Sequence, residues 1–226
     1  MPASRFAAVL FDLDGTLTDS APQLAASANA LRTARGMPPL PFAALREAAG
    51  KGARGLINAA LRVAPEATSF DGLKTEFLAN YESRLAEEAV LFPGIAELLA
   101  ELTRAGIPWG IVTNKAEHLA HLILESSPVL QEAQCLVGGD TTGKMKPAPD
   151  SIKEGLKRLG VSAHSALYAG DDERDMIAAR AAGTAAAALS WGYVAGGPLS
   201  IDRWGADIVV RHPAELADFV FGRRPL

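Results

Sequence analysis

The sequence predicts an α/β fold, in which a doubly wound parallel sheet carries a small α-helical cap domain inserted after its first strand. Apolar runs of strand length alternate with segments of helical periodicity. Residues 21–91 show helical spacing without a clear strand pattern. Hydrophobic residues make up 49% of the 226-residue chain. This length and composition suffice for a large core and a smaller second domain.

The first strand is expected over residues 7–11, an uninterrupted apolar run typical of strands that are covered on both faces. Further strands are expected over residues 107–112, 134–137, 166–169, 184–189 and 208–210. Helices alternate with them over residues 95–104, 117–125, 151–159 and 176–182. Because this alternation builds parallel sheets with right-handed crossovers, the ends of the first and fourth strands can lie side by side.

Residues 17–91 interrupt this alternation. Apolar residues recur there at helical spacing, with turn signals between the stretches 24–31, 42–49, 56–61 and 73–85. The segment is too long to be a loop. We therefore expect a cap domain of four or five helices at residues 17–91. The catalytic core then consists of residues 1–16 and 92–226.

Acidic residues follow two of the expected strands. Asp12 and Asp14 come directly after the first strand, where open α/β sheets bind ligands. Asp171, Asp172 and Asp175 follow the fourth, although acids in that position also suit the first turn of a helix. Carboxylates gathered at one edge raise one another's pKa and require protons or a cation. Oxygen ligands alone favour Mg²⁺ over softer metals.

Two other strand ends offer groups that bind anions. Thr113 and Asn114 supply a hydroxyl, an amide and backbone N–H groups at a helix start, although an ordinary N-cap has the same residues. Lys146 places a cation beside a proline-rich turn, with Lys144 as a competing cation. With a magnesium ion, these groups form a receptor for a phosphate dianion. An adjacent aspartate can attack the bound phosphoryl group, and a second one can act as the acid.

These four motifs, in this order and at strand ends, resemble those of the haloacid dehalogenase-like hydrolases, whose core is Rossmann-like. The resemblance implies that Asp12 attacks phosphorus and becomes an aspartyl-phosphate. It implies that Asp14 protonates the leaving alcohol and then activates water. Thr113, Asn114 and Lys146 would bind the phosphate.

The same resemblance implies a magnesium site. The Asp12 carboxylate, the Asp14 backbone carbonyl and Asp171 would hold the ion. Asp175 would support the site from outside, and Asp172 is a possible further partner. The helical cap would close over the site and exclude water during transfer.

The resemblance also narrows the reaction. An aspartate at position 14 argues against dehalogenases and phosphonatases, and it favours a phosphate-ester hydrolase over a sugar-phosphate mutase. Residues 113–115 and 191–193 look like those of phosphoglycolate phosphatases. Asp172 and residues 204–207 are similar to N-acetylmuramic acid 6-phosphate phosphatases. Phosphoglycolate and N-acetylmuramic acid 6-phosphate are therefore both kept as alternative substrates.

Specificity is expected to come from the cap. The segment 50–55 is glycine-rich and basic, and its Lys51 and Arg54 are candidates for contact with a substrate carboxylate or hydroxyl. The alternative is a turn between helices whose charges are simply solvated.

Composition excludes several other classes of function. A net charge of −4 and the lack of a basic stripe argue against nucleic acid as a partner. Four histidines argue against a histidine-rich zinc site. A single cysteine, Cys135, fits a reducing compartment. With no signal peptide or membrane span recognised, we expect a cytoplasmic monomer or weak homodimer that binds a small phosphorylated metabolite and no membrane.

Overall fold

The computed structural model describes residues 4–85, 89–194 and 201–223. Its centre is a six-stranded parallel sheet with the strand order β3-β2-β1-β4-β5-β6. The strands are β1 (Ala8–Phe11), β2 (Trp109–Val112), β3 (Leu136–Val137), β4 (Ala166–Gly170), β5 (Ala185–Leu189) and β6 (Ile208–Val210). The predicted fold is confirmed, including the pairing of the first strand with the fourth.

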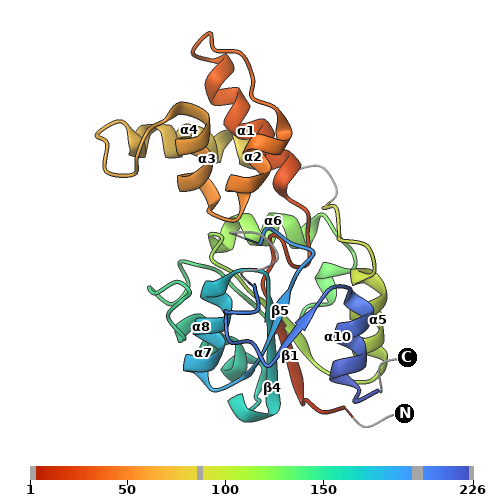
Figure 1. The fold of residues 1–226 in the computed structure, drawn as a ribbon. Coiled ribbons are helices and arrows are strands. Elements are labelled where there is room, and N and C mark those ends of the chain that lie inside the picture. Colours follow the sequence, from red (N-terminus) through yellow and green to blue (C-terminus); the bar gives the residue numbers. More distant parts are fainter. Residues whose placement is uncertain (1–3, 86–88, 195–200, 224–226) are drawn as a thin grey trace.

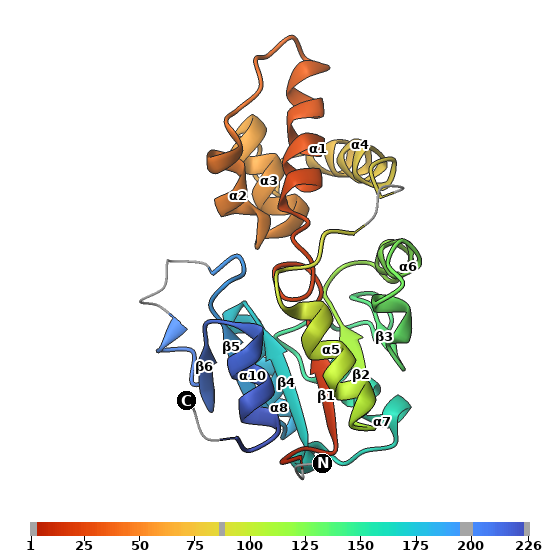
Figure 2. The same cartoon turned by 90° about the vertical axis from the view of Figure 1, so that its right-hand side faces the viewer.

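Helices cover both faces of the sheet, as a doubly wound fold requires (Figures 1 and 2). The core helices are α5 (Ile95–Arg104), α6 (Glu117–Glu125), α7 (Asp150–Leu159), α8 (Glu173–Ala182) and α10 (Pro213–Val220), with 3₁₀ turns η1 (Leu130–Glu132) and η2 (Ala163–Ser165). The alternation of side chains along β1 explains the two layers. Val9 and Phe11 belong to the apolar cluster that includes α5 and α10, whereas Leu10 belongs to the one that includes α7 and α8.

Four helices lie beyond the carboxyl edge of the sheet, and we call them the cap (Figure 1). They are α1 (Ala21–Thr33), α2 (Phe42–Ala49), α3 (Gly52–Leu61) and α4 (Phe70–Glu82). Their apolar sides form a shared interior, in which Leu31, Leu45 and Leu56 are fully buried. The chain enters and leaves the cap along neighbouring segments, joined by an antiparallel bridge between Thr18 and Leu91. The boundaries at residues 17 and 91 remain a prediction.

The helix and strand limits differ from expectation where local hydrogen bonding decides them. The second strand begins at Trp109, because Pro108 has no N–H to give to a ladder. Helix α8 begins at Glu173, three residues earlier than expected, because Asp172 and Asp175 form a capping box there. Helix α3 begins at Gly52, so most of the expected 50–55 turn is helical. In the described part of the chain, none of the helices is long and apolar enough to cross a bilayer.

Candidate active site

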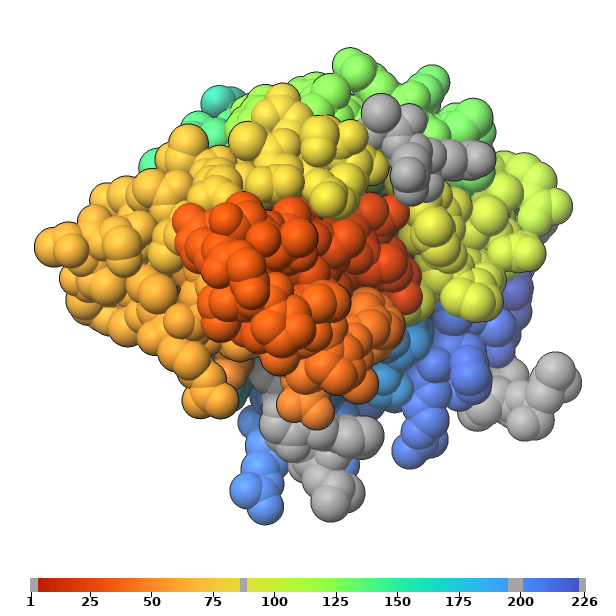
Figure 3. All heavy atoms as spheres, turned by 90° about the horizontal axis from the view of Figure 1, so that it is seen from above, coloured from red at the N-terminus to blue at the C-terminus, as the bar shows by residue number. Residues whose placement is uncertain are grey.

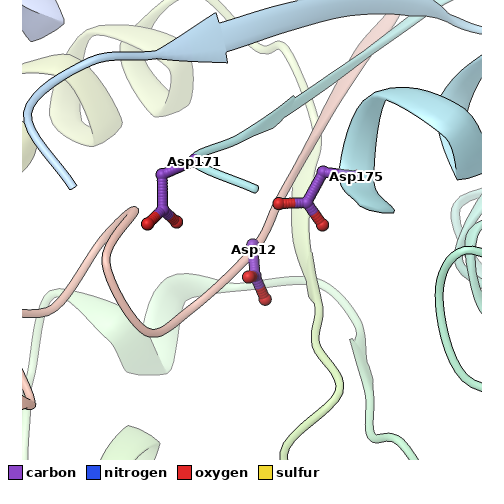
Figure 4. A group of neighbouring side chains, drawn as sticks. All are labelled: Asp12, Asp171 and Asp175. Atoms are coloured by element: carbon purple, nitrogen blue, oxygen red, sulfur yellow. The ribbon is translucent and has the colours of Figure 1, made fainter. Parts of the chain in front are cut away.

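Three carboxylates meet where β1 and β4 end side by side. Phe11 pairs with Ala169, so Asp12 and Asp171 leave the sheet at the same edge. Asp175 reaches the same place from the first turn of α8. Oxygen atoms of Asp12, Asp171 and Asp175 lie within 4.8 Å of one another, and Figure 4 shows the three side chains around one space. The sequence predicted convergence of Asp12 and Asp171 with Asp14, whose carboxylate makes different contacts.

Asp171 is held from two sides. The Thr16 hydroxyl donates to its Oδ1 at 2.8 Å, and the Tyr193 backbone N–H donates to its Oδ2 at 2.7 Å. Gly15, with φ of +83°, lies so close that a Cβ there would be 2.2 Å from Oδ2. Burial, followed by the charges of Asp12 and Asp175, raises the pKa of Asp171 well above its usual value. A cation in this position would relieve that cost.

Asp14 is bound by groups on both sides of the junction with the cap. The Lys115 ammonium lies 2.9 Å from Oδ2, and the Ser20 hydroxyl donates to Oδ1 at 2.5 Å. Lys115 also donates to the Tyr81 hydroxyl at 2.8 Å, at the end of α4. Burial lowers the pKa of Lys115, but Asp14 and Tyr81 outweigh it and raise the pKa overall. Lys115 belongs to residues 113–115, which resemble phosphoglycolate phosphatases, but the sequence did not predict its contact with Asp14.

Lys146 is a buried ammonium surrounded by oxygen atoms. It lies 3.0 Å from Asp12 Oδ1 and 2.8 Å from Asp175 Oδ1. It also donates to the Val112 carbonyl at 3.0 Å and to the Tyr168 hydroxyl at 2.7 Å. Burial lowers its pKa, but Asp12 and Asp175 more than compensate and raise it. The Lys146 ammonium therefore links the candidate nucleophile, Asp12, to the buried Asp175.

Asn114 fixes the backbone that presents Lys146. Its Nδ2 donates to the Lys146 carbonyl at 2.9 Å, and its Oδ1 accepts from the Lys146 N–H at 2.8 Å. The neighbouring Thr113 is buried, and its hydroxyl accepts from the Lys115 N–H at 3.3 Å. Both residues line the cavity described below. Their phosphate-binding roles stay predictions, but the Asn114 side chain already has a positioning task.

The two acids at the start of α8 have separate tasks. Asp175 accepts the Asp172 N–H at 3.1 Å, and burial raises the pKa of Asp175 to about 6 against the opposing charge of Lys146. Asp172 caps the helix and pairs with Arg174 at 2.8 Å. The Arg174 guanidinium continues to the Gly50 carbonyl in the cap, also at 2.8 Å. Through Arg174, Asp172 connects the core to the cap.

A cavity of about 650 Å³ separates the cluster from the cap. Asp12, Thr113 and Lys146 line its core side. Seen from above, the cap helices cover the middle of the molecule (Figure 3). The charged cap residues that line the cavity are all cations, namely Lys51, Arg54 and Lys74. Lys51 and Arg54 were expected to be candidates for substrate contact, whereas Lys74 was not predicted from the sequence.

The acid cluster has the properties of a site for a hard divalent ion. All its donors are carboxylate oxygens, which such ions prefer. Asp12 Oδ1 is buried and has no hydrogen-bond partner among the described residues, although the Lys146 ammonium is nearby. A buried carboxylate oxygen that lies 3.0 Å from one ammonium, beside a second carboxylate of raised pKa, fits an additional cation.

Comparison with known proteins is consistent with this geometry. Residues 9–189 match the family model described as haloacid dehalogenase-like hydrolase. A phosphoglycolate phosphatase of Xanthomonas campestris pv. campestris is 46% identical over 92% of this chain and 94% of its own length. An N-acetylmuramic acid 6-phosphate phosphatase of Pseudomonas putida is 38% identical over 94% and 95% of the two chains.

A solved structure supports the same assignment. It is described as a predicted phosphoglycolate phosphatase from Haemophilus somnus 129PT, and it aligns with a TM-score of 0.82 at 28% identity. The alignment covers 94% of this chain and 97% of that one. The family match runs from the second residue of β1 to the end of β5 and therefore includes every carboxylate of the cluster. This chain belongs to the haloacid dehalogenase-like hydrolases.

Proposed function

We propose that this protein is a Mg²⁺-dependent phosphatase that hydrolyses a small phosphomonoester through an aspartyl-phosphate at Asp12. The observation that carries the proposal is the position of the Asp12 carboxylate. It borders the cavity, contacts the Lys146 ammonium at 3.0 Å and belongs to the acid cluster. A phosphoryl group in the cavity would thus meet a nucleophile, a cation and a candidate metal site together.

The residues supply a balanced two-step reaction. An Asp12 oxygen bonds to phosphorus as the ester P–O bond breaks, and Asp14, protonated when this step begins, gives its proton to the leaving oxygen. Water then attacks the aspartyl-phosphate, Asp14 takes a proton from that water, and the Asp12 carboxylate is released. Lys115 and Ser20 hold Asp14 during both steps. When bound among the acids, Mg²⁺ would neutralise charge on the phosphoryl oxygens.

The cap suggests that the substrate also carries a carboxylate. Lys51, Arg54 and Lys74 line the cavity opposite the acid cluster, so the charge across it changes sign. A small phosphorylated acid would place its phosphate on the core and its carboxylate near the cap cations. 2-Phosphoglycolate has this pattern, and the Xanthomonas relative named for this substrate is 46% identical.

The size of the cavity favours a second candidate. Pockets that bind small molecules measure roughly 300–1,000 Å³. The cavity of about 650 Å³ lies within this range and is far larger than a two-carbon ester needs. Leu24, Phe77 and Leu78 give the cap side an apolar wall. N-acetylmuramic acid 6-phosphate combines a phosphate, a carboxylate and a sugar ring. The Pseudomonas putida relative is named for it.

Initial rates on three esters test the proposal. We expect release of inorganic phosphate from 2-phosphoglycolate or N-acetylmuramic acid 6-phosphate, with glucose 6-phosphate as the control that lacks a carboxylate. EDTA should remove the activity and Mg²⁺ should restore it. Phosphorus NMR distinguishes free phosphate from the new sugar phosphate that a mutase would make. Turnover that is indifferent to EDTA, or absent on all three esters, would count against the proposal.

The proposed compartment is the cytoplasm. The single cysteine of the chain is free and buried, which suits a reducing environment. Fractionation of cells that produce the protein tests this assignment. Recovery with secreted proteins would contradict it. Sedimentation would separately test the expected monomer or weak homodimer.

A further inference from the structure

The segment after β5 lies directly on the candidate metal site. The Tyr193 backbone N–H donates to Asp171 Oδ2 at 2.7 Å. The Trp191 indole N–H donates to the Thr16 carbonyl at 3.0 Å. Gly192 is so close that a Cβ there would lie 2.1 Å from the Gly15 carbonyl oxygen and 2.5 Å from the Asp171 Cβ. Movement of this segment would therefore disturb Asp171.

The side chain of Tyr193 extends from this segment to the base of the cap. Its hydroxyl donates to Asp19 Oδ1 at 2.8 Å and accepts the Ala21 N–H at 2.8 Å. Its ring meets Phe92 edge-on, at 6.4 Å between centroids. The Arg46 guanidinium lies 5.3 Å from the ring centroid and pairs with Asp19 at 3.1 Å. One buried side chain thus contacts both connections between core and cap.

The start of α1 depends on this contact. The first N–H groups of a helix need partners from outside the helix. Ser20 stands at the N-cap but makes no capping bond with its side chain, because its hydroxyl is given to Asp14. The N–H of Ala21, the first helical residue, is satisfied by the Tyr193 hydroxyl. The same helix start is therefore tied to Asp14 directly and to Asp171 through Tyr193.

We propose that Tyr193 is a positioning residue that couples the seating of the cap to the orientation of Asp171. When the cap is seated, Asp19 and Ala21 hold the hydroxyl, and the Tyr193 backbone holds Asp171 Oδ2. When the cap moves away, the hydroxyl loses both partners and the segment is freed. Substrate enclosure and the arrangement of the metal site would then change together.

Tyr193→Phe separates the hydroxyl from the rest of the residue, since the ring and the backbone N–H remain. We would attach spin labels to the exposed positions of Thr33→Cys in α1 and Lys153→Cys in α7 and measure their distance by double electron–electron resonance. The unsubstituted protein should give one main distance. Tyr193→Phe should add a population at longer distance. The control Trp191→Phe removes a bond of the same segment within the core and should leave the distance unchanged.

Metal binding provides the second measurement, and it requires no substrate. Mn²⁺ titrated into the protein and followed by electron paramagnetic resonance should bind about tenfold more weakly to Tyr193→Phe, as expected for loss of a hydrogen bond to a charged group. Trp191→Phe is a control for the spin-label distance only and not for the Mn²⁺ affinity. If either the distance distribution or the Mn²⁺ affinity of Tyr193→Phe matches the unsubstituted protein, the coupling is wrong. Neither readout depends on the proposed phosphatase activity.

Asp19→Asn supplies an independent variant. It keeps the shape of the acceptor but removes the charge that binds the hydroxyl, so it should shift distance and Mn²⁺ affinity in the same direction. Because the two substitutions share the Tyr193–Asp19 hydrogen bond, the effect of the double variant should be smaller than the sum of the two single effects. Additive effects would overturn the coupling. Thermal unfolding identifies any variant that fails to fold. If Tyr193→Phe fails to fold, the same two measurements on Asp19→Asn test the proposal.

Discussion

The core side and the cap side of the cavity are built differently. On the core side, the carboxylates of Asp14 and Asp171 each accept two short contacts from fixed neighbours. On the cap side, Lys51, Arg54 and Lys74 are exposed cations on or beside helices. The comparison teaches that the carboxylates of the core side are fixed by their neighbours, whereas the cations of the cap side, which we propose for recognition, are exposed. Preorganised charges favour the reacting step, whereas exposed side chains can adapt to a ligand.

The largest expected effect concerns the nucleophile on the rigid side. Asp12→Asn should reduce turnover of any phosphate ester by at least about 10³-fold, because an amide cannot form the covalent intermediate. The measurement is phosphate release, with circular dichroism to confirm the fold. Asp150→Asn at the start of α7 is the matched control and should retain activity. Substantial turnover by Asp12→Asn would remove the contrast between the two sides.

The next effect is on stability. Lys146→Met leaves the buried carboxylate of Asp175 without its ammonium partner, and such losses cost about 3–5 kcal/mol. We expect a drop of that order in the free energy of unfolding, measured in urea. Lys153→Met removes an exposed lysine from α7 and should change stability by less than about 0.5 kcal/mol. An equally stable Lys146→Met protein would show that the core side is less tightly built than its contacts indicate.

A smaller effect is expected on the cap side. Lys74→Met should raise KM for the preferred carboxylate-bearing ester by about fivefold and leave kcat nearly unchanged, as expected for loss of uniform binding. On p-nitrophenyl phosphate, which has no carboxylate, the same substitution should change KM little. Lys157→Met, at an exposed position of α7, serves as the control for charge. A fall in kcat with unchanged KM would place Lys74 in the reaction itself.

The smallest expected effect concerns Cys135, a buried residue that directly precedes β3. Burial raises the pKa of the Cys135 thiol to about 11. A raised pKa keeps the thiol protonated at pH 8, so it should not react with a disulfide reagent such as DTNB in the folded protein. Reaction should follow unfolding in urea. Rapid reaction without denaturant would mean that the sheet opens locally.

The sequence was sufficient for the parts of the site that lie in one local pattern. Apolar runs ending on polar residues located Asp12 and Asp171, the proline-rich turn indicated Lys146, and the alternation of strands and helices located the sheet edge where they meet. Helical periodicity and turn signals predicted a cap of four or five helices, and the described residues contain four. These predictions succeed because each depends on neighbours in the chain or on rules for parallel sheets.

Contacts between distant segments were not predictable in the same way. The partners of Asp14 and of Lys146, namely Lys115 and Tyr168, depend on how strands and loops are placed in space. The third acid of the cluster is Asp175 because a capping box turns it towards β1. Lys74 lines the cavity only because α4 seats over the core. No local pattern distinguishes such residues from an ordinary solvated or helix-capping residue.

The bridge between Thr18 and Leu91 determines how the cap could be replaced by another segment. Because the chain departs and returns at adjacent residues, the whole intervening stretch can be exchanged without altering the register of any strand. A cap of different length or sequence could then be engineered onto the same core, and the carboxylates at the sheet edge would keep their places.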